Sequence, residues 1–157
     1  MNIREAKRED ADAIGILERE FGEYLRELGS TTEIISNMDW YLRDGFGDNP
    51  AFYGLVAEVN NKVVGYTLYH SGYDVDSLSR VLYVIDLFVH SDYRRQGIGR
   101  SLMERLSEIC IQQGGKYLVW EVWARNKIAI EFYKRIGAHR DKEMMIMVLP
   151  MMKKSTE

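Results

Sequence analysis

Cysteine is almost absent from this chain, and so are proline and long apolar runs. The single cysteine, Cys110, excludes an intramolecular disulfide and is typical of a reducing compartment. No apolar run approaches the ~18–20 residues that a membrane-spanning helix needs. The opening stretch MNIREAKRED is charged where a secretion signal has its apolar core. The sequence therefore predicts a cytoplasmic protein without a membrane segment.

A strong charge imbalance is also missing. Over 157 residues the formal net charge is −3, and both signs are spread along the chain without a basic block. We therefore expect neither nucleic acid nor a membrane as a partner. His70, His90 and His139 lack the spacing of metal ligands, so we expect no metal. The hydrophobic share of 46% is enough for one folded domain over residues 1–157.

Hydrophobic periodicity switches between strand and helix patterns along the chain. Strands are predicted at residues 2–7, 52–59, 62–70, 80–89, 117–123 and 144–149. Helices are predicted from Asp10, as N-cap, to about Leu28, from Thr31 or Thr32 along Ile35 and Met38 to Leu42, from Gly99 to Gly114, and over residues 126–136. The strand–helix–strand unit over 80–123 requires a parallel, right-handed crossover, whereas the Asn60–Asn61 turn predicts an antiparallel hairpin. The fold class is therefore α/β (α+β), a mixed sheet with helices on its faces.

The stretch SDYRRQGIGRS, residues 91–101, joins a predicted strand to a predicted helix. Glycines at Gly97 and Gly99 let a ligand approach the backbone, and the helix start offers free N–H groups. Three arginines flank them: Arg94, Arg95 and Arg100. This combination is typical of a pyrophosphate site. Leu102 stands where a Rossmann fingerprint needs glycine, and a P-loop lysine is missing. The alternative is a tight turn with solvated arginines.

The stretch NKIAIEFY forms a second candidate group. Asn126 and Tyr133 lie seven residues apart, so they share nearly one helix face, two turns from each other. Taken alone, Tyr133 is better explained as a core tyrosine. Together with the glycine turn it becomes a candidate functional residue.

The chain resembles the GNAT superfamily of acetyl-CoA-dependent N-acetyltransferases. The superfamily's loop pattern, Arg/Gln-x-x-Gly-x-Gly/Ala, is met by Arg94, Gly97 and Gly99. Three ordered segments, DGFGDNPAFYGLVAEV, LYVIDLFVHSDYRRQGIG and NKIAIEFYKRIGA, are similar to the diamine (spermidine/spermine) acetyltransferase branch. The resemblance covers nearly the whole chain and fades after Ala138. It implies a GNAT fold with a mostly antiparallel sheet, one splayed parallel strand pair and helices on both faces.

The resemblance also implies where acetyl-CoA binds. Its pantetheine arm would pair, as an added strand, with Leu87, Phe88 and Val89. Its pyrophosphate would lie beside Arg94 on the backbone N–H groups of the turn, which belong to Arg95, Gln96, Gly97, Ile98, Gly99 and Arg100. Asn126, Lys127 and Ala129 would flank it on the other side.

Two proton movements are implied by the chemistry of amine acetylation. Tyr133 matches the family's general acid, which protonates the departing thiolate. The diamine branch carries glutamate where this chain has Ile85, in YVID, and Asp86 is the remaining acidic neighbour. Because successive strand residues face opposite sides, Asp86 cannot replace that glutamate unless a bulge re-aims it. The missing glutamate argues against a long polyamine as substrate.

The expected activity is acetyl transfer from acetyl-CoA to a primary amine of a small molecule, such as a diamine or polyamine. Tyr24, Asp74 and Asp86 match positions of the branch that line its amine pocket, and Ile85 lies beside them. The branch also implies a homodimer, for which the methionines of residues 144–152 offer a surface. Two alternatives stay open, namely acetylation of proteins or peptides and an acyl-CoA-binding module without catalysis.

Overall fold

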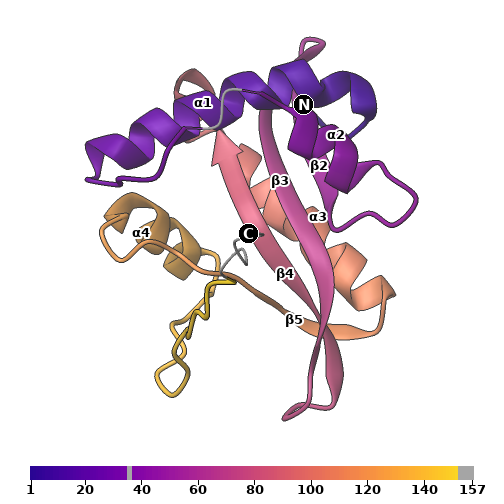
Figure 1. Ribbon diagram of the computed structural model, residues 1–157, viewed down its shortest axis with the longest axis vertical. Coiled ribbons are helices and arrows are strands. Elements are labelled where there is room, and N and C mark those ends of the chain that lie inside the picture. The colour runs from indigo at the N-terminus through magenta and orange to yellow at the C-terminus, as the bar shows by residue number, and fades with distance from the viewer. Residues whose placement is uncertain (35–36, 152–157) are drawn as a thin grey trace, which may run out of the picture.

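A five-stranded sheet forms the centre of the computed structural model, which describes residues 1–34 and 37–151 (Figure 1). Its strands lie in the order β1 (Asn2–Glu5), β2 (Tyr53–Val59), β3 (Lys62–Asp74), β4 (Ser79–Val89) and β5 (Gly115–Val119). Each pairing from β1 to β4 is antiparallel, and the β4–β5 pairing is parallel. The predicted mixed sheet is therefore confirmed.

Helices cover both faces of this sheet (Figure 1). Helices α1 (Ala11–Glu27) and α2 (Asp39–Gly45) lie on one face, α3 (Ile98–Gln112) covers the other, and α4 (Lys127–Arg135) follows β5. Two short 3-10 turns, η1 (Arg8–Asp10) and η2 (Ser91–Tyr93), lead into α1 and toward α3. The crossover from β4 through α3 to β5 is the strand–helix–strand unit that the sequence predicts.

Alternation along β2 builds a hydrophobic core on each face. Leu55 packs with Leu102 and Leu106 of α3, whereas Val56 packs with Ile14 of α1. All five side chains are fully buried. Since neighbouring residues of a strand face opposite sides, one apolar run serves two cores.

Asp10 does not cap α1 in the way that the sequence suggests. Its Oδ2 accepts hydrogen bonds from the Lys7 N–H and from Arg4, each at 2.8 Å. Arg4 also donates to Glu58 at 3.0 Å. The carboxyl is therefore engaged before the helix begins, and it ties η1 to the first two strands.

The second predicted helix begins later than expected. In the described residues it starts at Asp39, and Met38 occupies the N-cap position. Ile35, which the predicted stripe includes, lies outside the described residues. The Thr32 N–H donates to the Ser30 hydroxyl at 3.2 Å, so a local side-chain bond competes with helical pairing there.

The last predicted strand, residues 144–149, is wrong. In the described part of the chain these residues join no strand, and Met145 and Met147 are 80% and 83% exposed. The yellow segment after α4 runs as an irregular loop apart from the sheet (Figure 1). A strand needs a neighbouring edge, which periodicity alone cannot reveal. The strand predicted over 117–123 ends at Val119, and residues 120–123 leave the sheet.

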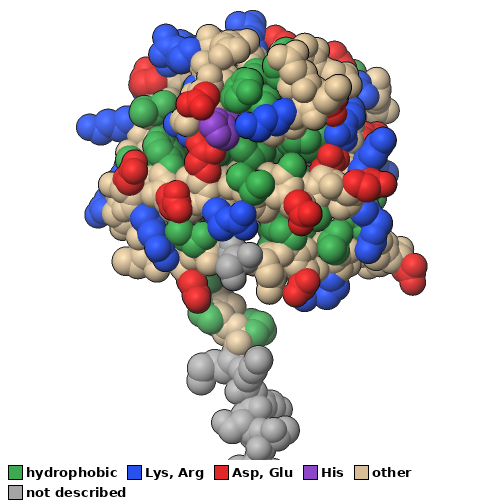
Figure 2. All heavy atoms as spheres, turned by 90° about the horizontal axis from the view of Figure 1, so that it is seen from above, with side chains coloured by type: hydrophobic (Ala, Val, Ile, Leu, Met, Phe, Trp, Pro, Cys, Tyr) green, Lys and Arg blue, Asp and Glu red, His purple; other side chains and the backbone are tan. Residues whose placement is uncertain are grey.

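Charges of both signs cover the surface. Figure 2 shows Lys and Arg side chains intermixed with Asp and Glu on the face seen from above. Among residues 1–34 and 37–151, no helix has the length and apolar character needed to cross a membrane. The same residues contain no group of three His, Cys, Asp or Glu side chains placed to hold a metal ion.

Candidate active site

The splay between β4 and β5 opens a cavity beside the sheet. The two strands pair over Arg80–Tyr83, after which β4 continues to Val89 while residues 120–123 diverge. The cavity between them measures about 370 Å³. Its walls contain Val84, Ile85, Asp86 and Leu87 from β4, Trp120, Glu121, Val122 and Trp123 after β5, Asn126, Ala129 and Tyr133 from α4 and its cap, and Phe21, Leu25, Ser30 and Thr32 from α1 and the segment after it. The predicted splayed strand pair is thus confirmed.

A β-bulge at Ile85 decides which way the side chains of β4 face. Leu68 is opposite Asp86 and Tyr69 is opposite Val84, so Ile85 has no partner on β3. In a regular strand Asp86 would share the face of Val84, because residues two apart point to one side. With the bulge, Val84 packs in the core on the α3 side, whereas Asp86 lies on the α1 side. The sequence did not decide whether a bulge re-aims Asp86, and the structure contains such a bulge.

Asp86 is held by hydrogen bonds on both carboxyl oxygens. Oδ2 accepts from the Tyr66 hydroxyl at 2.7 Å, and Oδ1 accepts from the Leu87 N–H at 2.9 Å. The buried Thr67 hydroxyl donates to the Asp86 carbonyl at 2.7 Å and holds the backbone next to the bulge. Burial, followed by the charge of Glu18, raises the pKa of Asp86 to about 7, although the two hydrogen bonds to its carboxyl oppose this shift. Such a carboxyl can exchange a proton near neutral pH.

Sequence reasoning missed Glu18 and Tyr66. Burial raises the pKa of Glu18, and the nearby Tyr66 hydroxyl opposes this shift. Tyr66 is fully buried, and burial and the two carboxylates raise the pKa of its hydroxyl well above the usual value. One signal was present, because Glu18 interrupts the apolar stripe of α1 between Ile14 and Phe21. A carboxyl on such a face needs a partner.

Tyr133 reaches the same cavity from α4. Its ring centroid lies 4.8 Å from that of Trp120 and 5.2 Å from that of Phe132. Burial, followed by the charge of Asp86, raises the pKa of the Tyr133 hydroxyl to about 12. The phenol therefore keeps its proton through the neutral range. Its role as the general acid stays a prediction.

Asn126 holds the start of α4. Its Oδ1 accepts hydrogen bonds from the Ala129 N–H at 3.1 Å and from the Tyr24 hydroxyl at 2.8 Å. Tyr24 thereby links α1 to the helix that carries Tyr133. Lys127, the first residue of α4, is exposed. The expected contacts of these residues with acetyl-CoA or an amine stay predictions.

The turn between η2 and α3 has an unusual backbone. Arg95 and Gly97 have φ angles of 64° and 85°, in the left-handed region. A Cβ on Gly97 would meet nothing within 4 Å, whereas a Cβ on Gly99 would lie 3.4 Å from Phe132. The backbone of Gly97 is therefore open to a ligand. Helix α3 begins directly afterwards at Ile98, and its first N–H groups have no intrahelical acceptors.

Arg94 already has partners within the chain. Its Nε donates to the Val89 carbonyl at 2.9 Å, and its guanidinium carbon lies 5.2 Å from the ring centroid of Tyr24 and 5.1 Å from that of Phe88. The Leu87 N–H is engaged as well, by the preceding carboxyl. Binding of a pyrophosphate by Arg94 and of a pantetheine arm by the end of β4 stay predictions. Arg95, Gln96 and Arg100 are exposed beside the open turn.

The four residues expected at the amine pocket are not all brought together. Asp86 and Ile85 line the cavity, and Ile85 is 46% exposed. Asp74 lies instead at the end of β3, where its carboxyl accepts from the Ser77 N–H at 2.9 Å and from the Asp76 N–H at 3.2 Å. The β3–β4 hairpin that it closes projects at the bottom of Figure 1. The observed contacts of Asp74 are those of a turn residue.

Glu121 supplies a further carboxyl to the cavity wall. It accepts a hydrogen bond from the Tyr83 hydroxyl, and the Tyr83 ring stacks on His70 with centroids 5.1 Å apart. Glu121 is therefore hydrogen-bonded and also lines the cavity.

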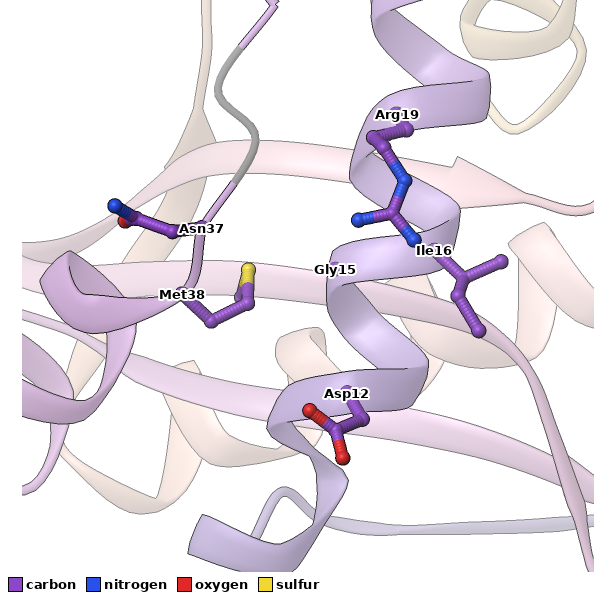
Figure 3. A pocket seen from close by; sticks show the side chains of 6 residues that line it. All are labelled: Asp12, Gly15, Ile16, Arg19, Asn37 and Met38. Atoms are coloured by element: carbon purple, nitrogen blue, oxygen red, sulfur yellow. The ribbon is translucent and has the colours of Figure 1, made fainter.

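A second hollow, of about 410 Å³, lies between α1 and residues 37–38 (Figure 3). Asp12, Ile16 and Arg19 extend from α1 around it, and Met38 lies opposite Gly15. It shares no lining residue with the splay cavity. Neither the glycine turn nor Tyr133 borders it, so it is a poorer candidate for the reaction site.

Comparison with known proteins gives one consistent result. The sequence profile of the acetyltransferase (GNAT) family matches residues 14–138. A thialysine N-epsilon-acetyltransferase from Bos taurus is 35% identical over 144 residues, which cover 87% of this chain and 82% of that protein. The spermidine/spermine N(1)-acetyltransferase-like protein 1 from Homo sapiens is 35% identical over 125 residues, covering 73% of this chain and 18% of that protein.

Solved structures agree on the fold. An integron cassette protein from the mobile metagenome of V. cholerae superposes with a TM-score of 0.79 at 26% identity, over 95% of this chain and 91% of that one. An aminoglycoside acetyltransferase from an uncultured soil metagenomic sample, in complex with sisomicin, superposes with a TM-score of 0.72 at 19% identity, over 96% of each chain. The second likeness concerns the fold alone.

Proposed function

This chain belongs to the acetyltransferase (GNAT) family and is an N-acetyltransferase, and we propose that it transfers the acetyl group of acetyl-CoA to a primary amine of a small molecule. The observation that carries this proposal is the splay cavity. Its walls bring a protonated phenol, Tyr133, and a partly buried carboxyl, Asp86, to one space. An acid and a base in one cavity suit a reaction that moves a proton from an amine and another to a thiolate.

The turn after β4 supports acetyl-CoA as the acetyl donor. The open side of Gly97 and the first N–H groups of α3 provide donors for a pyrophosphate, and Arg95 and Arg100 add positive charge nearby. Beyond Tyr83, β4 pairs with β3 but no longer with β5, so an extended pantetheine arm can lie along the edge of β4 that faces away from β3. Bound there, acetyl-CoA supplies an activated thioester.

The cavity walls support a cationic alkyl amine as the acceptor. Asp86 and Glu121 supply carboxyls, while Ile85, Trp120 and Trp123 supply apolar surface for a carbon chain. Two relatives are named a thialysine N-epsilon-acetyltransferase and a spermidine/spermine N(1)-acetyltransferase-like protein, and thialysine, spermidine and spermine are amines of this kind. Because Ile85 stands in place of a carboxylate, we propose a short amine rather than a long polyamine.

The test is release of free thiol from acetyl-CoA in the presence of thialysine, ornithine, spermidine or lysine-containing peptides. We expect turnover with a short diamine or amino acid, and weaker turnover with spermidine. Turnover restricted to peptides would contradict a small-molecule acceptor. Binding of acetyl-CoA without turnover of any amine would leave an acyl-CoA-binding module.

We further propose a cytoplasmic homodimer. The exposed apolar residues after α4, among them Met144, Met145 and Met147, give a surface that a second copy can bury. Light scattering on the full chain and on a chain ending at residue 143 tests this proposal. We expect the full chain to have twice the monomer mass and the shortened chain to lose this association, whereas a full-length monomer would contradict it.

A further inference from the structure

The amine needs a proton acceptor, and Ile85 occupies the strand position at which the resemblance to the diamine branch implies a glutamate. Ile85 lines the cavity but has no atom that can accept a proton. We propose that Asp86 takes the proton from the amine and that Glu18 and Tyr66 are positioning residues, Tyr66 through its hydrogen bond to the Asp86 carboxyl and Glu18 through its negative charge. This inference rests on the N-acetyltransferase function and names the residue that performs one of its steps.

Geometry places Asp86 where an amine can reach it. The bulge at Ile85 turns the Asp86 carboxyl to the α1 side of β4, and Asp86 is among the residues that line the cavity. The hydrogen bonds from Tyr66 and the Leu87 N–H fix both oxygens, so little reorganisation is needed when a proton arrives. Tyr133 belongs to the same wall, so acid and base border one space.

The charges around Asp86 favour an incoming cation. The titratable groups that face it are Glu18 from α1, Tyr66 from β3, Tyr133 from α4 and, across the cavity, Glu121. Among the described residues, no lysine or arginine forms a salt bridge with Asp86 or Glu18. Arg94, which lies near the end of β4, gives its hydrogen bond to the Val89 carbonyl. Two carboxyls without a cation destabilise each other's charged form, and an ammonium group relieves this repulsion.

With Asp86 as the proton acceptor, every proton of the reaction is accounted for. The ammonium nitrogen gives one proton to an Asp86 oxygen, and its freed lone pair forms the new C–N bond to the acetyl carbon. The C–S bond breaks, and the thiolate takes a proton from Tyr133. The second proton of the nitrogen restores the Tyr133 phenol, and the proton on Asp86 passes to solvent. The net products are the amide, the free thiol and one proton.

The first test is the pH dependence of kcat/KM in Asp86→Asn. We expect wild-type kcat/KM to fall as pH drops through about 7, because the acceptor carboxyl becomes protonated. In Asp86→Asn this fall of kcat/KM below about pH 7, the acidic limb of the pH profile, should disappear. At pH 7.5, kcat/KM should be lower than in the wild type by ~10²–10⁴-fold. The deficit should shrink about tenfold per pH unit toward the amine's own pKa near ~10, because free amine then needs no acceptor. A variant that keeps the limb near pH 7 would overturn the proposal.

Glu18→Gln and Tyr66→Phe should shift the limb in opposite directions. The charge of Glu18 raises the pKa of Asp86, so its removal should move the limb to lower pH. The Tyr66 hydrogen bond lowers that pKa, so its loss should move the limb to higher pH. Glu23→Gln, an exposed glutamate on the same helix, is the matched control and should leave the limb in place. Shifts of equal sign, or none, would contradict the roles of both residues.

A readout without turnover separates this inference from the proposed function. Infrared difference spectra of the protein alone should show a carboxyl that gains a proton between about pH 8 and pH 6, as the raised pKa of Asp86 requires. Asp86→Asn should lose that band, and calorimetry with coenzyme A should show that the variant still folds and binds. If wild type acetylates no amine at any pH, the proposed function fails. If wild type is active and the band survives in Asp86→Asn, the assignment of Asp86 fails by itself.

Discussion

Ile85→Glu tests why this chain should handle long polyamines poorly. Ile85 is the extra residue of the β4 bulge, lines the splay cavity and is 46% exposed. The substitution places a carboxyl at the position where the resemblance to the diamine branch implies one. The side chain already borders a space that an amine is expected to enter, so the new carboxyl needs no rearrangement of the sheet.

The magnitude follows from exposure and charge. Full burial of an isoleucine side chain contributes about 1.5–3 kcal/mol to stability. Because Ile85 is 46% exposed, the substitution loses roughly half of this contribution, and the free energy of unfolding should fall by ~1 kcal/mol. A carboxylate ~5 Å from an ammonium group gains ~3 kcal/mol at an effective dielectric constant of ~20. Desolvation and repulsion from Asp86 offset part of this gain. We therefore expect kcat/KM for spermidine to rise at least about tenfold, equivalent to ~1.4 kcal/mol.

The assay is thiol release with spermidine from pH 6 to pH 9, with Ile85→Gln as the control of equal length without charge. The gain should grow with pH as the new carboxyl ionises. An equal gain in Ile85→Gln would show that polarity rather than charge matters. If spermidine were the best substrate of the wild type, the expectation that Ile85 disfavours long polyamines would be refuted. A large loss of stability would mean that Ile85 faces the core.

Three further substitutions, together with Gly114→Ala as a matched control, test the remaining parts of the site. Tyr133→Phe keeps the ring contacts, so kcat should fall by ~10²–10⁴-fold with coenzyme A affinity unchanged by calorimetry; a few-fold effect would mean that water protonates the thiolate. Gly97→Ala should lower the free energy of unfolding by ~1–2 kcal/mol because of its φ of 85°, and it should also weaken coenzyme A binding. Gly114→Ala, at a φ of 76° and with open space around its Cβ, should lower stability alone; equal affinity in both variants would remove the pyrophosphate site. Asn126→Ala removes an oxygen shared by the α4 cap and Tyr24, so urea denaturation should show a loss of ~1–2 kcal/mol; an unchanged midpoint would contradict that cap.

The sequence by itself determined the features that depend on local chemistry. Gly97 is needed where the backbone turns left-handed into a helix, and the predicted strand–turn–helix unit is observed there. The seven-residue spacing places Asn126 and Tyr133 on nearly one helix face, and the structure shows Asn126 as the N-cap of α4. The alternating apolar pattern predicted the strands of the sheet up to Val119 and the helices on both faces. Each of these features is specified by residues that are close together in the chain.

Tertiary structure alone decided where Asp86 points and what surrounds it. Strand periodicity gives a face only while the register is regular, and the bulge at Ile85 reverses that face for every later residue of β4. Glu18 and Tyr66 come from other elements, and packing of α1 on the sheet brings them to Asp86. The predicted strand over residues 144–149 failed for a related reason, because a strand exists only where a partner edge is available. Pairing between distant segments is set by the assembled sheet, and no local pattern contains it.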